Sequence, residues 1–382
     1  MRVVHIVPGI EDVANGMAVV ARLIANEQGD AEVVDLNHGM HRIHGKGVEE
    51  VWVHGMWLPR EWRVCRAALK AGKRLVRMTH GSLSPIYLER QGKWKKRLAG
   101  PIEKWLLRKA SCIVATCAAE KEWIEAYLGG RCPKVEVTDI KRFFTFSHKE
   151  HKGHKDFSRI EHVERVEGGD CFNTEAQGHR GAEQDGELPS ADGGLHLLYL
   201  GRRHPLKGLE YLEEAVRQMQ NDSNPVNPVN PVKNSSTRSP CSAWLTPSAP
   251  SASLRLCVKI ISSAFGEERE KAWDWCDVLV LPTLSENFGL VVAEALERGK
   301  CVITTDGAPA WEEGLELVSG GVGSGEIWSG YGGRLVYLKG YRDGSKENRV
   351  KLLKGAIRSV ALRPRCAWDV NEDNILLSTN HN

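Results

Sequence analysis

The sequence lacks the cysteine patterns of metal sites and disulfide frameworks. Its ten cysteines include no Cys-x-x-Cys pair, and no His-x-x-x-His accompanies them. Cys112 and Cys117 lie five residues apart, beside an apolar run. Isolated cysteines of this kind are typically buried and reduced in proteins of a reducing compartment. The pattern therefore argues against a zinc site and against disulfide staples.

Long hydrophobic runs and a strong charge imbalance are also missing. The longest apolar stretches, such as Val278–Leu281, are far shorter than the ~20 residues of a membrane-spanning helix. The opening MRVVHIVPG has no long apolar core and no small-residue cleavage site, so it predicts a first strand and no signal peptide. The net charge of +3 demands no nucleic-acid partner. We therefore expect a cytoplasmic protein that does not bind nucleic acid.

One cofactor motif is absent from the place where it should stand. A dinucleotide-dependent oxidoreductase carries Gly-x-Gly-x-x-Gly directly after its first strand. Here that strand is followed by Pro8-Gly9-Ile-Glu-Asp, which cannot supply the three glycines. We therefore expect no dinucleotide cofactor.

What is present is enough apolar material for two domains. The chain has 382 residues, of which 41% are hydrophobic and 26% charged. Short apolar runs alternate with segments of helical periodicity, which predicts α/β domains with doubly wound parallel sheets. The predicted division is an N-terminal domain, a polar linker, a C-terminal domain with a low-complexity insertion of Asn-Pro-Val repeats, and a frayed tail, over residues 1–145, 146–194, 195–364 (insertion 221–253) and 365–382.

The predicted strands and helices can be placed by residue range. In the first domain we expect strands over 2–8, 32–36, 50–54, 74–78 and 112–116, and helices over 17–27, 61–71, 93–109 and 119–127. In the second we expect strands over 195–200, 254–261, 277–281 and 301–305, and helices over 208–219, 267–276, 290–298 and 348–362. The linker carries His148, His151 and His154 among lysines, which fits either a metal-binding run or a solvated linker.

Two loops at predicted strand ends carry candidate site residues. Glu286 stands in the loop after one strand, and Glu294 about one turn into the following helix. Unpaired amides at a helix start favour anions, and each carboxylate can accept hydrogen bonds from a sugar diol. The plainer alternative is a capping glutamate and a solvated one. In the other loop Arg202 and Lys207 are able to clamp a diphosphate, or they belong to an ordinary basic loop.

Together these residues resemble glycosyltransferase family 4, the group 1 glycosyltransferases of GT-B fold. The matching pieces are Gly201-Arg202…Lys207-Gly208, the Glu-x7-Glu element at 286–294 with its continuation, and Thr79-His80-Gly81-Ser-Leu-Ser-Pro. The resemblance covers about residues 1–145 and 195–315. It implies two Rossmann-like domains that face each other across a cleft.

The resemblance also implies roles for the matching residues. The catalytic set would be Arg202 and Lys207 on the donor diphosphate, Glu286 on hydroxyls of the transferred sugar, and His80 beside that sugar. The donor-binding set would be Gly16, Asn287, Phe288, Gly289, Leu290 and Glu294, the last on the ribose. His54 is a weaker candidate on the acceptor side. The chain has no Asp-x-Asp triplet, so we expect neither a metal nor another cofactor at the diphosphate.

The implied activity is retaining transfer of a hexose from a nucleotide-sugar donor to a saccharide or lipid-linked glycan. The family frequently builds lipopolysaccharide or other cell-surface polysaccharide. Residues 93–109 combine Trp94, Leu98 and Trp105 with several cations. They predict either peripheral contact with the inner face of the cytoplasmic membrane or a helix with a solvated basic face.

Two alternatives remain besides the oxidoreductase. One is a nucleotide-sugar epimerase of the same fold, which needs a carboxylate placed for proton abstraction. The other is a non-catalytic or degraded module that binds a nucleotide sugar, which the insertions favour and the intact Glu286, Glu294, Arg202 and Lys207 oppose.

Overall fold

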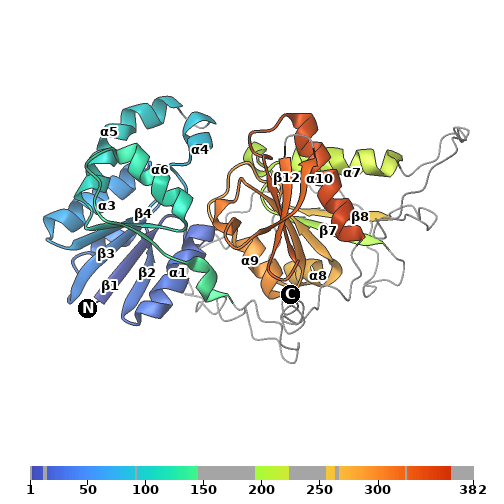
Figure 1. Ribbon diagram of the computed structural model, residues 1–382. Coiled ribbons are helices and arrows are strands. Elements are labelled where there is room, and N and C mark those ends of the chain that lie inside the picture. Colours follow the sequence, from blue (N-terminus) through green and yellow to red (C-terminus); the bar gives the residue numbers. More distant parts are fainter. Residues whose placement is uncertain are drawn as a thin grey trace, which may run out of the picture.

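The structure is a computed structural model that describes residues 2–11, 15–90, 93–144, 194–222, 255–262, 266–322 and 325–362. It contains two α/β units, each a sheet with helices on both faces, side by side (Figure 1). The predicted linker, insertion and tail, with the three linker histidines, lie almost entirely outside the described residues.

The first sheet has six parallel strands in the order β2-β1-β3-β4-β5-β6. Its strands are β1 (Arg2–Val7), β2 (Ala31–Asp35), β3 (Val48–His54), β4 (Arg74–Met78), β5 (Cys112–Ala115) and β6 (Val135–Val137). The helices are α1 (Gly16–Gln28), α2 (Gly39–Arg42), α3 (Pro59–Lys70), α4 (Pro85–Arg90), α5 (Lys93–Lys109) and α6 (Ala118–Leu128), followed by a short 3-10 helix, η1 (Ile140–Phe143). Strand order reverses between β1 and β3, which opens a crevice at their carboxyl ends.

Alternating side chains explain why this sheet is covered on both faces. Along β1, Val3 packs on the side of α1 with Val20 and Ile24. Val4 and Ile6 face the opposite way, into the core shared with α3 and α6. Because successive side chains of a strand point to opposite faces, an unbroken apolar run packs against the helices on both faces of the sheet.

The second sheet has seven strands in the order β11-β12-β13-β10-β9-β7-β8. The strands are β7 (Leu195–Leu200), β8 (Leu256–Ile261), β9 (Val278–Val280), β10 (Cys301–Thr305), β11 (Glu316–Val322), β12 (Gly325–Gly330) and β13 (Leu335–Lys339). The helices are α7 (Leu209–Asp222), α8 (Gly266–Trp275), α9 (Leu290–Glu297) and α10 (Lys346–Ala361), with 3-10 turns η3 (Pro205–Lys207) and η4 (Pro309–Trp311). α7 and α10 cover one face, and α8 and α9 the other.

Four described strands were not predicted from the sequence. They are β6, at the edge of the first sheet, and β11, β12 and β13 of the second. β12 runs antiparallel to both its neighbours, and it starts and ends in glycine, at Gly325 and Gly330. Glycine at both ends weakens the strand signal of β12, so its strand depends on pairing. β13 begins with four buried apolar residues, a local signal for a strand that the prediction passed over.

The two units meet through aromatic packing at the second unit's site loop. Phe288, two residues before α9, is buried and its ring stacks on that of Phe144 at a centroid distance of 6.2 Å. The Trp311 ring also packs against Phe288, with ring centroids 5.2 Å apart, and its indole N–H donates to the Phe288 carbonyl. The loop that carries Glu286 is therefore anchored in apolar surface from both units.

Candidate functional site

The candidate site of the second unit lies at the point where its strand order reverses. β7 pairs with β8 on one side and with β9 on the other, so the loops that leave β7 and β9 diverge there. Those loops carry the two predicted motifs, residues 201–208 and 281–289. Crevices at such reversals are where ligands bind in open parallel sheets.

Close backbone packing ties the two loops together. The Leu206 carbonyl accepts from the Leu284 amide at 2.8 Å and from the Thr283 hydroxyl at 3.0 Å. Gly208 has φ +64°, and a Cβ atom there would lie 2.0 Å from the Pro282 carbonyl oxygen. Only glycine fits this approach, because it tolerates positive φ and leaves room for the neighbouring chain.

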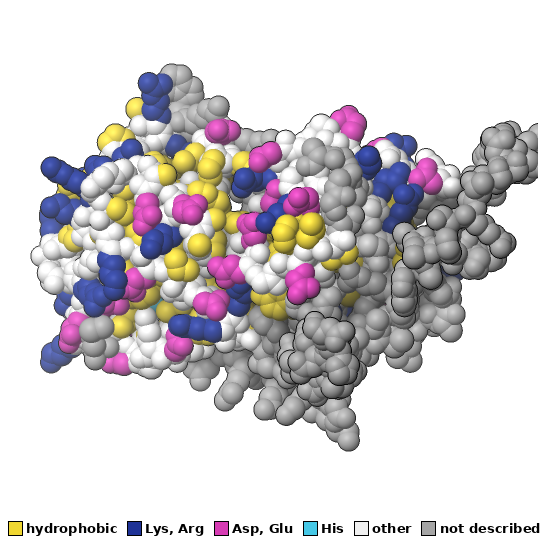
Figure 2. Space-filling view, in the orientation of Figure 1, with side chains coloured by type: hydrophobic (Ala, Val, Ile, Leu, Met, Phe, Trp, Pro, Cys, Tyr) yellow, Lys and Arg dark blue, Asp and Glu magenta, His cyan; other side chains and the backbone are white. Residues whose placement is uncertain are grey.

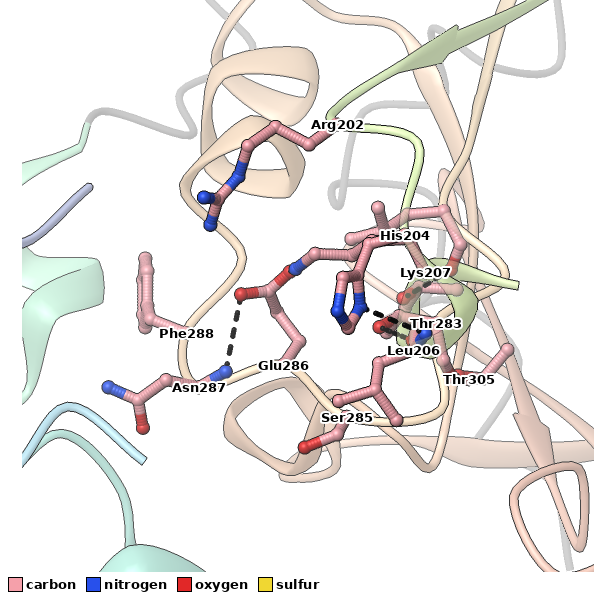
Figure 3. A network of polar contacts seen from close by, with 12 residues as sticks. Arg202, His204, Leu206, Lys207, Thr283, Ser285, Glu286, Asn287, Phe288 and Thr305 are labelled. Atoms are coloured by element: carbon pink, nitrogen blue, oxygen red, sulfur yellow. Dashed lines mark hydrogen bonds and ion pairs between the residues drawn. The ribbon is translucent and has the colours of Figure 1, made fainter. Parts of the chain in front are cut away.

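Lys207 and Glu286 meet across these loops as an ion pair (Figure 3). Their side chains are 20% and 21% exposed, so the pair is accessible without being fully solvated. The Glu286 amide donates to the Gly307 carbonyl at 2.7 Å, which fixes the backbone beneath the carboxylate. Two residues predicted to act on different parts of one ligand are thus in direct contact.

Arg202 is exposed at the opposite side of this pair. Its guanidinium points toward the space beside Glu286 and Phe288 (Figure 3). Its side chain has no ion-pair or hydrogen-bond partner among the described residues, whereas the neighbouring Arg203 pairs with Glu213 at 3.3 Å. Arg202 is therefore a cation available to a ligand.

The start of α9 adds unpaired amides to these cations. Gly289 precedes the helix with φ +73°, and no side chain caps the helix. The amides of Phe288, Gly289 and Leu290 donate to no acceptor in the part of the chain that the structure describes. Amides and helix dipole both favour an anion, so this element complements Arg202 and Lys207.

Glu294 already has a charged partner within the protein. It is 12% exposed and forms an ion pair with Arg269 of α8. Burial raises the pKa of its carboxyl above the usual range, and the nearby Arg269 opposes that rise. A ribose diol at this position would meet a carboxylate that is already bound to a guanidinium.

His80 lies at the end of β4 in the first unit, with an uncommon backbone conformation, φ +49°. Glu120, a buried carboxylate of α6, brackets it. One carboxylate oxygen accepts from the Thr79 hydroxyl at 2.6 Å and from the Gly81 amide at 2.5 Å. Burial lowers the pKa of the His80 imidazole to about 3. The loop around His80 is therefore rigidly held with a neutral ring.

Several contacts join the two units at the predicted site residues. A Cβ atom at Gly81 would lie 3.0 Å from Asn287 Cβ, and one at Gly16 would lie 3.4 Å from Leu290 Cδ1. The Thr116 hydroxyl donates to the Asn287 side chain at 2.8 Å. The structure thus places members of both predicted sets, from both units, around the loop before α9.

His54 lies beside His80 rather than on a separate acceptor surface. Its Nδ1 is 2.8 Å from His80 Nε2, and its side chain is fully buried. It therefore reaches a ligand only through His80.

Sequence reasoning missed the residues that support this site. Glu120, Arg269 and Trp311 each fix a residue of the site, but they lie 23 to 41 positions from the residue that they contact. The available signal for Glu120 was a glutamate in the first turn of the helix that follows β5. Among the described residues no group of three or more His, Cys, Asp or Glu side chains is placed to hold a metal ion. Nor does any described helix have the length and hydropathy to cross a membrane.

Two family models match the chain, one for each unit. The model of the glycosyl transferase 4-like domain matches residues 11–139, and that of the glycosyl transferases group 1 matches residues 194–322. The chain belongs to the group 1 glycosyltransferases. It is thus a glycosyltransferase, and the oxidoreductase and epimerase alternatives are not supported.

Solved structures show the same architecture despite low identity. A UDP-forming α,α-trehalose-phosphate synthase from Burkholderia xenovorans, in complex with glucose-6-phosphate, is 8% identical with a TM-score of 0.53, covering 98% of this chain and 95% of its own. The catalytic domain of starch synthase IV from Arabidopsis thaliana, bound to ADP and acarbose, is 9% identical with a TM-score of 0.51, covering 97% and 94%. The predicted GT-B fold is confirmed. No protein in a set of curated proteins matches this sequence.

Proposed function

We propose that this glycosyltransferase moves a hexose from a nucleotide-sugar donor to a saccharide or lipid-linked glycan, with retention of the anomeric configuration. The observation that supports it is the gathering of Arg202, Lys207, Glu286 and the amides of residues 288–290 at one strand reversal. Cations and unpaired amides suit a diphosphate, and a carboxylate beside them suits sugar hydroxyls.

The chemistry follows from where charge develops. The acceptor hydroxyl oxygen bonds to the anomeric carbon on the face from which the diphosphate leaves, and the bond from that carbon to the diphosphate oxygen breaks. The departing oxygen takes the proton of the acceptor hydroxyl. Arg202, Lys207 and the start of α9 stabilise the negative charge that grows on the diphosphate. Because these groups supply the compensating charge, we also propose that transfer needs no metal ion.

A donor panel tests this proposal. The full chain is incubated with UDP-, GDP- and ADP-hexoses in EDTA, with membrane extract as acceptor source, and nucleotide release is measured. We expect release from one donor, falling about 10²–10³-fold in Arg202→Ala, the effect typical of losing one transition-state donor. Arg203→Ala is the matched control, because it removes a neighbouring arginine that is paired with Glu213. No release from any donor would favour a non-catalytic nucleotide-sugar-binding module.

The assignment of the domains is part of the same proposal. Residues 195–364 would bind the donor and residues 1–145 the acceptor, for use in lipopolysaccharide or other cell-surface polysaccharide synthesis. The division is supported by the position of the diphosphate-binding groups, all of which lie in the second unit.

A membrane-bound acceptor is supported by the surface of α5. Leu98 is 78% exposed and Trp105 is 44% exposed on a helix with several lysines and arginines. Figure 2 shows basic side chains gathered along the outer edge of the first unit. We expect the protein to float with vesicles containing anionic lipid, and Leu98→Glu to weaken this binding. Equal recovery with neutral vesicles would contradict an electrostatic contribution.

A further inference from the structure

Three histidines from three neighbouring strands form a continuous line of ring-to-ring contacts beside the candidate site. His5 comes from β1, His54 from β3, and His80 follows β4. His5 Nδ1 lies 3.0 Å from His54 Nε2, and His54 Nδ1 lies 2.8 Å from His80 Nε2. At the far end, His5 Nε2 lies 2.8 Å from the side-chain oxygen of Gln28, the last residue of α1. We call these four residues the histidine relay.

The His5 and His54 rings are buried, and all three histidine rings of the relay are uncharged. His5 and His54 are both inaccessible to solvent, and the His5 ring stacks on Trp52 at a centroid distance of 4.8 Å. Burial lowers the pKa of His5 to about 4 and holds that of His54 well below its usual range. After burial, the neighbouring His80 and His5 rings and the buried Arg77 further lower the pKa of His54. Each ring therefore carries a single proton at neutral pH.

The orientation of the Gln28 side chain sets where those protons lie. Its amide oxygen, which only accepts, faces His5 Nε2, so in this arrangement His5 Nε2 carries the proton and His5 Nδ1 accepts. His54 then donates from Nε2 and accepts at Nδ1, and His80 must donate from Nε2 to fill that position. The remaining nitrogen, His80 Nδ1, is an acceptor with no partner among the residues that the structure describes.

We propose that His5, His54 and Gln28 are positioning residues, which fix His80 in the tautomer whose Nδ1 accepts a hydrogen bond. The ligand group that it recognises is then a donor, a hydroxyl of the transferred sugar, and not an oxyanion such as a carboxylate or phosphate. This specificity rests on the proposed function, because it needs a sugar beside His80. The geometry agrees, since Gly81, the next residue, packs on Asn287 of the donor-side loop.

The backbone and the ring of His80 are held independently. Glu120 binds the Thr79 hydroxyl and the Gly81 amide on either side of it, while His54 holds the ring. A side chain fixed at both levels keeps its acceptor atom in place before the ligand arrives, which is what selective recognition of one hydroxyl requires.

The tautomer is measured without any substrate. NMR spectra that correlate ring nitrogens with ring protons are recorded at pH 7 on the full-length protein with 15N-labelled histidine. The variants His5→Gln, His54→Gln and His80→Gln assign the signals. We expect all three relay rings protonated on Nε2 alone. A proton on His80 Nδ1, or a doubly protonated His80, would overturn the proposal. This readout stands even if no donor is turned over, so its failure is distinct from that of the proposed function.

A substitution at Gln28 tests whether the tautomer of His80 affects catalysis. Gln28 is exposed, and Gln28→Lys replaces the acceptor by a donor, which should move the His80 proton to Nδ1. We expect kcat/KM to fall about tenfold with a change in kcat, the effect of one lost hydrogen bond in the transition state. Gln28→Glu instead keeps an acceptor at this position, so it should retain both the tautomer of His80 and the rate, unlike Gln28→Lys. Asn26→Lys, an exposed residue on the same turn, should change neither.

The relay is not used for specificity if the His80 tautomer shifts in Gln28→Lys while kcat/KM stays within twofold of the wild type. The same substitution should reduce discrimination between the donor and its analogues lacking one sugar hydroxyl. Equal discrimination in both proteins for every such analogue would likewise overturn the assignment.

Discussion

The Lys207 ammonium is bound by the Glu286 carboxylate in the described structure, although the two residues have separate roles in the proposed mechanism. In the proposed complex, the diphosphate competes with Glu286 for Lys207, and sugar hydroxyls compete with Lys207 for Glu286. Mutual pairing keeps both charges satisfied and preplaced until the donor replaces them. Because Lys207 and Glu286 belong to different loops, a donor that replaces their pairing also acts on the contact between residues 201–208 and 281–289.

Removing this cation should impair transfer much more than stability. Lys207→Ala is expected to lower kcat/KM for the donor by about 10²–10³-fold, since one charge on the leaving group is lost. Lys351→Ala, an exposed lysine of α10, is the matched control and should leave the rate unchanged. Steady-state kinetics of nucleotide release provide the measurement. Similar rates for the two variants would remove Lys207 from the mechanism.

Arg269 should support Glu294 rather than bind the ligand. Arg269→Ala leaves a carboxylate that is 12% exposed without its ion pair, at a cost on the order of 1–3 kcal/mol in the free energy of unfolding. The double variant with Glu294→Ala should be more stable than Arg269→Ala alone, because no orphaned charge remains. Lys271→Ala, which breaks an exposed pair of the same helix, should cost less than about 0.5 kcal/mol. Urea unfolding gives all these values, and additive effects in the cycle would contradict the coupling.

Glu61 should make stability decrease with rising pH. Its side chain is buried, and burial raises its pKa from 4.5 to about 7. The native state therefore keeps the proton that the unfolded chain releases above pH 4.5, so the contribution is complete below that pH. It is lost as the pH rises through 7, on the order of 3 kcal/mol in total.

The matched variant for this effect is Glu61→Gln, which stays neutral throughout. The difference in free energy of unfolding between variant and wild type should favour the variant increasingly from pH 5 to pH 8. Taking the difference also cancels the contributions of His5, His54 and His80, whose lowered pKa values act in the opposite direction below pH 6.5. A difference that does not vary with pH would mean that Glu61 ionises normally in the native state.

Gly208 should tolerate no side chain. Gly208→Ala combines positive φ with a Cβ atom 2.0 Å from the Pro282 carbonyl oxygen, so the two site loops must separate. We expect several kcal/mol of destabilisation and loss of transfer, because Lys207 moves with the loop. Gly72→Ala has nearly the same φ, +67°, in open space and should cost only about 1 kcal/mol. Thermal unfolding of both variants measures the two losses of stability. Equal losses would show that the positive φ alone, and not the contact with Pro282, causes the destabilisation.

Much of this site was predictable because parallel strands end at one edge of a sheet. Arg202, Lys207 and Glu286 each follow an apolar strand, so recognising the strands was enough to expect that they converge. The pairing of Lys207 with Glu286 was not predicted, because it depends on how two loops fold over each other. The same holds for Thr116 and Asn287, which are 171 positions apart.

By itself, the sequence determined the alternation of strands and helices, the parallel strands of the two sheets and the loops that carry the cations and carboxylates. These features follow from local periodicity and from glycines at strand ends. Only the tertiary structure decided that β11–β13 extend the second sheet, that Glu120 brackets His80, and that His5 and His54 align its ring. The reason is physical: a buried polar side chain is satisfied by whatever group the packing brings near, and no local pattern records that partner.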